Sequence, residues 1–132
     1  GGLVAEAFPS PARVAAVIAQ ARTHEVALKF TAGLHHPVRF PAREPRVMMH
    51  GFLNVFGAAC LAWGADLTGD DLVACVAETD PTAFVFDGET FTWRGHAVAA
   101  AAIRHLRSRW LCGFGSCSFA EPRDDLFKLG LF

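Results

Sequence analysis

The residues best suited to chemistry lie at the end of an apolar stretch, residues 26–31. Lys29 stands there between two large apolar residues, and such a setting favours the neutral amine that forms a Schiff base with a carbonyl. Of the 12 basic residues only Lys29 and Lys128 are lysines, and an arginine does not form such an imine. We therefore predict that Lys29 is catalytic. The alternative is a lysine that reaches solvent or pairs with Glu6 across a sheet.

Three histidines lie in or beside the long connection formed by residues 32–50: His35, His36 and His50. Imidazole titrates near neutral pH, so each histidine is a candidate general acid or base. Metal binding is one alternative, in which one of the adjacent pair joins His50 and a carboxylate such as Glu44. Polar loop contacts are another. Because adjacent side chains on an extended backbone point apart, His35 and His36 are not expected to share one ion, and we predict neither a metal nor a cofactor.

Four further residues are candidates for binding a substrate: Thr31, Gly33, Arg39 and Asn54. Arg39 belongs to a loop with three arginines, which could clamp a phosphate or carboxylate or simply be solvated. Asn54 is the only polar side chain of the apolar stretch 51–64. It lies in the first turn of the expected helix, where free N–H groups and the helix dipole favour an anion. The alternative is that backbone carbonyls satisfy Asn54.

The pattern Lys-x-Thr-x-Gly-Leu at residues 29–34 resembles the Schiff-base strand of deoxyribose-phosphate aldolases, which are (β/α)8-barrel enzymes. The resemblance implies that Lys29 forms the imine and that Thr31 and Gly33 shape the end of the strand. It spans six residues, after which this chain continues with two histidines and a proline in place of the family's phosphate-supporting turn. More broadly, roughly the first 60 residues look like consecutive βα units from the later half of such a barrel.

The elements that must position these residues follow from local patterns. Residues 2–8 and 26–31 are expected to be strands, and residues 12–21 a helix with Ser10 as its N-cap. Strand, helix and strand with short connections form a parallel βαβ unit, and the second strand is apolar enough to be buried on both faces. The site would then lie at the carboxyl end of a parallel strand, where such sheets bind their ligands. The buried face of the helix is predicted from the spacing of Val14, Val17, Ile18 and Ala21.

The remaining elements are helices and one hairpin. Asp-Gly between two alternating apolar runs predicts an antiparallel hairpin at residues 83–93. Helices are expected at 51–64, from the N-cap Thr68 to before Pro81, at 96–111 and after Glu121, with a tight turn at 113–119. The predicted fold class is α/β: parallel βαβ units of barrel-like type with an added antiparallel β-hairpin and C-terminal helices.

Composition limits the class of protein. The chain has 132 residues, of which 52% are hydrophobic and 19% charged, and its net charge is −1. This fits a single α/β domain at residues 1–132, whole or as the C-terminal part of a larger barrel-like chain, since a barrel needs about 250 residues. We predict no nucleic-acid partner, because there is no basic excess, and no membrane partner, because no apolar run reaches about 18 residues. A cytoplasmic location is expected.

These residues favour an enzyme of lyase (aldolase-like) type that acts on a small carbonyl or phosphorylated metabolite, with Lys29 at the end of a strand. One alternative is a metal-dependent hydrolase that uses the loop histidines. Another is a non-enzymatic assembly module whose apolar helix is buried against a partner chain. We expect a homo-oligomer, unless an N-terminal part of the chain is missing.

Overall fold

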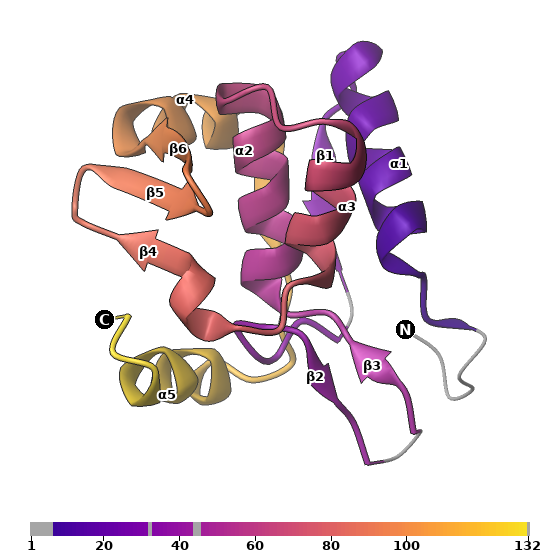
Figure 1. Cartoon of the computed structure of the whole chain (residues 1–132), viewed down its shortest axis with the longest axis vertical. Coiled ribbons are helices and arrows are strands. Elements are labelled where there is room, and N and C mark those ends of the chain that lie inside the picture. The colour runs from indigo at the N-terminus through magenta and orange to yellow at the C-terminus, as the bar shows by residue number, and fades with distance from the viewer. Residues whose placement is uncertain (1–6, 32, 44–45, 132) are drawn as a thin grey trace.

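The computed structural model describes residues 7–31, 33–43 and 46–131. The fold is mixed α/β (Figure 1), and the described strands form one parallel pair and two separate antiparallel sheets. Helices fill the space between these sheets. Among the described helices, none combines the length and the apolar character required to cross a membrane.

The first helix, α1 (Pro11–Thr23), is confirmed together with its N-cap. The Ser10 side chain accepts a hydrogen bond from the backbone N–H of Arg13 at 3.2 Å, and Pro11 occupies the first turn. The predicted buried face is wrong at one position: Val17 is 51% exposed, whereas Ile18 is fully buried. Packing against α3 (Gly69–Ala77) therefore selects a face that is rotated relative to the one predicted from spacing.

The strand β1 (Leu28–Phe30) pairs in parallel with β7 (Leu111–Phe114). The local sequence did not predict that residues 111–114 form a strand. The tight turn predicted for residues 113–119 is therefore wrong at its start, where residues 113–114 belong to β7. The prediction that β1 is buried on both faces is also wrong, since Lys29 is exposed and its two neighbours are only half-buried. The expected strand at residues 2–8 lies almost entirely outside the described residues. The barrel-like relationship stays a prediction, because β1–β7 is the only parallel pair among the described strands.

The long connection contains a short hairpin that local patterns did not predict. Its strands β2 (Phe40–Pro41) and β3 (Met48–Met49) pair antiparallel. The hairpin projects at the end of the molecule near the start of α1 (Figure 1). After the hairpin the backbone returns toward the core, where His50 is buried.

The apolar stretch that follows forms the centre of the core, as predicted. It begins as a π-helix, η2 (Leu53–Gly57), and continues as α2 (Ala58–Gly64), in which Ala58, Ala59 and Leu61 are fully buried. The next helix is α3, with Asp70 and Asp71 in its first turn as expected for the helix dipole. Its expected cap is wrong in detail, because the Thr68 side chain makes no capping hydrogen bond.

The predicted hairpin is confirmed by β4 (Phe84–Phe86) and β5 (Thr90–Trp93). The Asp87 carboxylate accepts hydrogen bonds from the N–H groups of Glu89 at 2.9 Å and Thr90 at 2.7 Å. A third strand, β6 (His96–Ala99), pairs with β5. The helix expected from residue 96 therefore begins later, as α4 (Ala100–Arg109).

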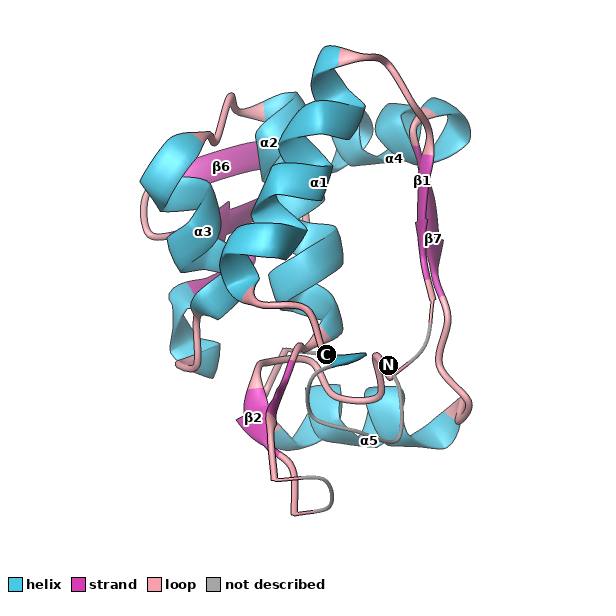
Figure 2. Cartoon of the chain, turned by 90° about the vertical axis from the view of Figure 1, so that its right-hand side faces the viewer, coloured by secondary structure: helices cyan, strands magenta, loops and turns pink. Residues whose placement is uncertain are grey.

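The last helix, α5 (Ala120–Lys128), confirms the C-terminal amphipathic helix. It lies across the carboxyl ends of β1 and β7, whereas α1 lies on the far side of the gap beside β1 (Figure 2). The connections leaving β1 and β7 thus run between the strand ends and α5.

Candidate functional site

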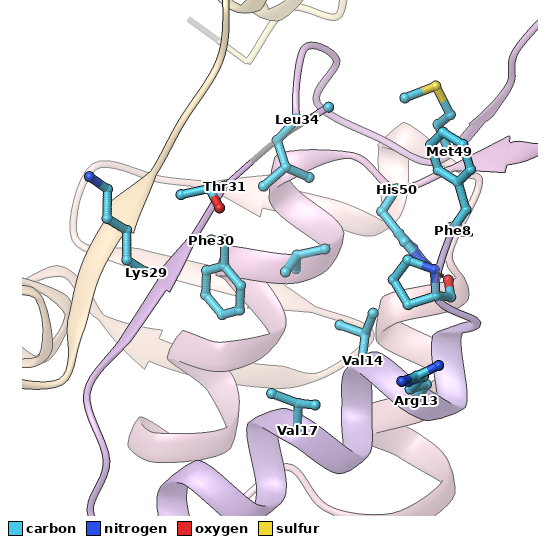
Figure 3. A pocket seen from close by; sticks show the side chains of 13 residues that line it. Phe8, Arg13, Val14, Val17, Lys29, Phe30, Thr31, Leu34, Met49 and His50 are labelled. Carbon is cyan, nitrogen blue, oxygen red and sulfur yellow. Dashed lines mark hydrogen bonds between the residues drawn. The ribbon is translucent and has the colours of Figure 1, made fainter. Parts of the chain in front are cut away.

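A cleft of about 350 Å³ lies between α1 and β1 (Figure 3), and we call it the α1–β1 cleft. It contains four of the eight predicted site residues: Lys29, Thr31, Gly33 and His50. The other lining residues are Phe8, Pro9, Arg13, Val14, Val17, Phe30, Leu34, Met49 and Val55.

The described lining of the cleft is an apolar floor with basic residues at its edge. Val14, Val17 and Phe30 face the same space in Figure 3. Arg13 and Lys29 also line the cleft, and among the described lining residues there is no carboxylate. Arg13 was missed at the sequence level, although it stands four residues before Val17 and so shares its helix face. An apolar floor with cations at its edge suits a small anion that carries an apolar body.

In the observed rotamer Lys29 does not direct its ammonium into the cleft. Its side chain is exposed rather than enclosed by apolar groups, which corrects the expectation of an apolar setting. Figure 3 shows its ammonium directed away from His50, while the neighbouring Phe30 turns into the cleft. Alternation along the short strand is the cause, because successive side chains point to opposite faces. In this rotamer Lys29 meets solvent.

Gly33 and Thr31 follow the strand and line the cleft. Gly33 has φ +76°, a region in which other L-residues are strained. A Cβ atom there would lie 3.2 Å from the terminal methyl group of Met49. Gly33 therefore allows a tight bend and a close approach by Met49, which agrees with the predicted role in shaping the strand end.

His50 is buried and carries one hydrogen bond. Its Nε2 lies 2.7 Å from the carbonyl oxygen of Pro9; since a carbonyl only accepts, Nε2 carries the proton. Nδ1 is buried without a hydrogen-bond partner among the described residues. Burial lowers the pKa of His50, and the charge of Arg39 adds to this effect, whereas interactions with the backbone of Pro9 and Val76 oppose it. The net effect favours the neutral form of His50.

His35 and His36 turn away from the cleft and bind α5. His36 Nδ1 lies 2.5 Å from the Asp125 carboxylate, and His35 Nδ1 lies 3.2 Å from the Glu121 carboxylate. Ser116 Oγ is 3.3 Å from the same nitrogen of His35. A nucleophile–base–acid relay needs the hydroxyl and the carboxylate on different ring nitrogens. These two histidines therefore join the loop after β1 to α5 and do not form such a relay.

The partners of these histidines were missed at the sequence level. Glu121 and Asp125 lie 86 and 89 residues away from them along the chain, and no local spacing links them. Among the described residues, no group of three or more His, Cys, Asp or Glu side chains is placed to hold a metal ion. The alternative of a hydrolase whose metal is bound by the loop histidines also used Glu44, which lies outside the described residues, and it stays a prediction.

Asn54 positions the loop and does not face a ligand. It is fully buried; its Oδ1 accepts from the Arg39 N–H at 2.6 Å, and its Nδ2 donates to the carbonyls of Cys75 at 3.1 Å and Glu78 at 2.8 Å. Of the two interpretations drawn from sequence, the one with backbone partners is confirmed. Arg39 is half-buried, and its Nε has no partner among the described residues.

The N-terminal end of the core helix is also occupied by protein groups. The N–H groups of Phe52 and Leu53 donate to the carbonyls of His36 and Pro37, each at 2.9 Å. Gly51 permits this approach, because a Cβ atom there would overlap the Pro37 backbone. The expectation that this end receives an anion is therefore wrong.

Comparisons of the chain with protein-family models, with curated proteins and with solved structures find no significant match. The site must be interpreted from its own geometry.

Proposed function

We propose that the α1–β1 cleft binds a small metabolite that has an apolar body and a terminal phosphate or carboxylate. The observation that carries this proposal is the described lining, with Arg13 and Lys29 among apolar side chains and no carboxylate. The half-exposed Val17 supports it, because an apolar side chain left open at a concave surface favours ligand contact.

The catalytic form of the proposal is lyase (aldolase-like) chemistry on a small carbonyl or phosphorylated substrate. In it, the Lys29 amine attacks the carbonyl carbon, and the carbonyl oxygen leaves as water when the imine forms. Lys29 must first turn its side chain toward the cleft. His50 lines the cleft and has a lowered pKa that favours its neutral form, which supports a role as proton acceptor.

Calorimetric titration with three-carbon to five-carbon sugar phosphates, and with the same sugars unphosphorylated, tests the binding proposal. We expect the phosphorylated compounds to bind and the unphosphorylated ones to bind at least tenfold more weakly. The variant Arg13→Gln should weaken phosphate binding about tenfold, the effect of one charged hydrogen bond. The matched control Arg104→Gln, on exposed α4, should leave the affinity unchanged. Equal affinity with and without the phosphate would refute the proposal.

Borohydride reduction in the presence of the same sugar phosphates tests the catalytic form separately. A trapped adduct on Lys29, located by peptide mass spectrometry and absent from Lys29→Arg, is the expected result. Binding without any adduct on Lys29 would leave the ligand proposal standing and remove the imine chemistry.

The proposal includes self-association and a cytoplasmic location. Val85 and Phe86 lie on the edge strand β4 and are 50% and 46% exposed, which favours a partner chain along that edge. Sedimentation at several concentrations should reveal a dimer or larger species, and a monomer at all concentrations would contradict it. The four cysteines are free, which supports a reducing compartment.

A further inference from the structure

A second cavity, of about 370 Å³, lies between the core helix, the β4–β5 hairpin and α5, and we call it the aromatic pocket. Among the described residues, eleven line it, all of them apolar, and five of these are phenylalanines. Phe86 is the one exposed member and marks where the pocket reaches the surface. Leu131, which follows α5, lines the same pocket as Phe86 of β4. The pocket shares no lining residue with the α1–β1 cleft.

The π-helix η2 builds one wall of this pocket. It carries Phe56 and Gly57 to the lining, and a Cβ atom at Gly57 would come within 2.7 Å of the Phe91 ring. Phe91 can thus lie against the helix backbone and leave the space beside it open. π-helical turns cost regular hydrogen bonding and are found often at functional sites.

The end of α5 closes the opposite wall. Gly130 has φ +67°, its N–H donates to the Phe127 carbonyl at 3.1 Å, and the Leu131 N–H donates to the Leu126 carbonyl at 3.0 Å. This pair of bonds is a Schellman motif, which folds the residue after the glycine back over the last turn. Leu126 and Leu131 therefore face the pocket together.

A cation, Arg107, lies next to this apolar lining. The Arg107 guanidinium carbon lies 6.0 Å from the centre of the Phe56 ring. Arg107 is one turn after Ile103 on α4, so it shares a helix face with a lining residue. Its charge also acts on Cys60 in the wall, where burial still raises the thiol pKa to about 12 and keeps it neutral. Among the described residues, no carboxylate forms an ion pair with Arg107.

We propose that the aromatic pocket binds an apolar carboxylate, with the hydrocarbon among the phenylalanines and the carboxylate at Arg107. A cavity of about 150 Å³ takes up benzene. At the same density, 370 Å³ accommodates roughly fifteen non-hydrogen atoms. Decanoate falls within this limit. The inference does not depend on the function proposed for the α1–β1 cleft.

Calorimetric titration with decanoate and decan-1-ol tests the inference. We expect decanoate to bind at one site, about fivefold more tightly than the alcohol, as a partly exposed ion pair contributes. In Arg107→Gln this preference should disappear, whereas Arg104→Gln on the same helix and Arg13→Gln in the other cleft should keep it.

A second experiment fills the pocket with a larger side chain. Ile103→Trp should abolish decanoate binding, while the volume-matched Ile103→Leu should retain it; thermal unfolding of both variants verifies that they fold. Absence of saturable decanoate binding at millimolar concentration would overturn the inference. So would a preference for decanoate that survives in Arg107→Gln, or binding that a folded Ile103→Trp leaves unchanged.

Discussion

Glu78 is a buried carboxylate whose removal should weaken the fold in a pH-dependent manner. Its Oε1 accepts from the N–H groups of Thr79 and Asp80, each at 3.0 Å, and its Oε2 accepts from Trp93 Nε1 at 3.1 Å and Arg94 Nε at 2.6 Å. Its backbone carbonyl also accepts from Asn54. Glu78 therefore joins the end of α3 to the β5–β6 turn and helps to hold the loop that carries Arg39.

The contribution of Glu78 to the free energy of unfolding follows from its pKa. Burial alone would raise this pKa, but the hydrogen bonds from Arg94, Asp80 and Trp93 lower it to about 2. Against an unfolded value of about 4.3, the difference corresponds to about 3 kcal/mol at neutral pH. The Glu78 side chain is 8% exposed but that of Arg94 is 55% exposed. Solvent screening therefore reduces the expected contribution to about 2 kcal/mol.

The variant Glu78→Gln tests this value. Because the folded pKa lies below the unfolded one, the stabilisation is complete above about pH 5 and is lost as pH falls toward 2. Urea unfolding followed by circular dichroism should therefore show wild type more stable than Glu78→Gln at pH 7, and the two equal near pH 2. Exposed Glu89→Gln is the control and should show no difference at any pH. A gap between wild type and Glu78→Gln that is constant from pH 6 to pH 2 would refute the reasoning.

Three further predictions concern stability. Glu25, two residues after the end of α1, has φ +53°, so Glu25→Gly should raise the free energy of unfolding by about 1 kcal/mol; an unchanged thermal midpoint would contradict this. Gly51→Ala should cost about 3 kcal/mol because its methyl group has no space, whereas Gly115→Ala, with its nearest neighbour at 3.9 Å, should be tolerated in the same urea titration. The hydrogen bond from His36 lowers the pKa of Asp125, so stability from this pair is present above about pH 4 and is lost below it. Asp125→Asn should cost about 1 kcal/mol at pH 7, and proteolysis within α5 should accelerate; unchanged cleavage would argue against it.

Local signals account for the elements that were predicted correctly. Ser10 and Pro11 lie directly before α1, and Asp87 bonds the N–H groups two and three residues later. Each of these interactions closes within a few residues, so its strength does not depend on distant packing. The buried helix at residues 51–64 was also predictable, because a helix that is apolar all round is stable only inside a core.

The errors concern partners that lie far apart in the chain. β1 pairs with β7 across about 80 residues, and the pattern of β7 is weakened by Gly113. β6 was taken for the start of a helix because the alanines of residues 97–102 favour one, but pairing with β5 makes His96–Ala99 a strand. The candidate site was affected in the same way, since His35 and His36 find carboxylates on α5.

The sequence by itself determined most of the helices, the β4–β5 hairpin and which side chains are capable of chemistry. Only the tertiary structure decided where those side chains point. Lys29 and Phe30 are adjacent, yet one meets solvent and the other enters the α1–β1 cleft, because successive side chains of a strand point to opposite faces and the cleft lies against only one face of β1. Arg107 gains its place beside an apolar pocket only because η2, the hairpin and α5 meet there. Burial depends on which distant surfaces pack together, and the local spacing of residues does not specify those surfaces.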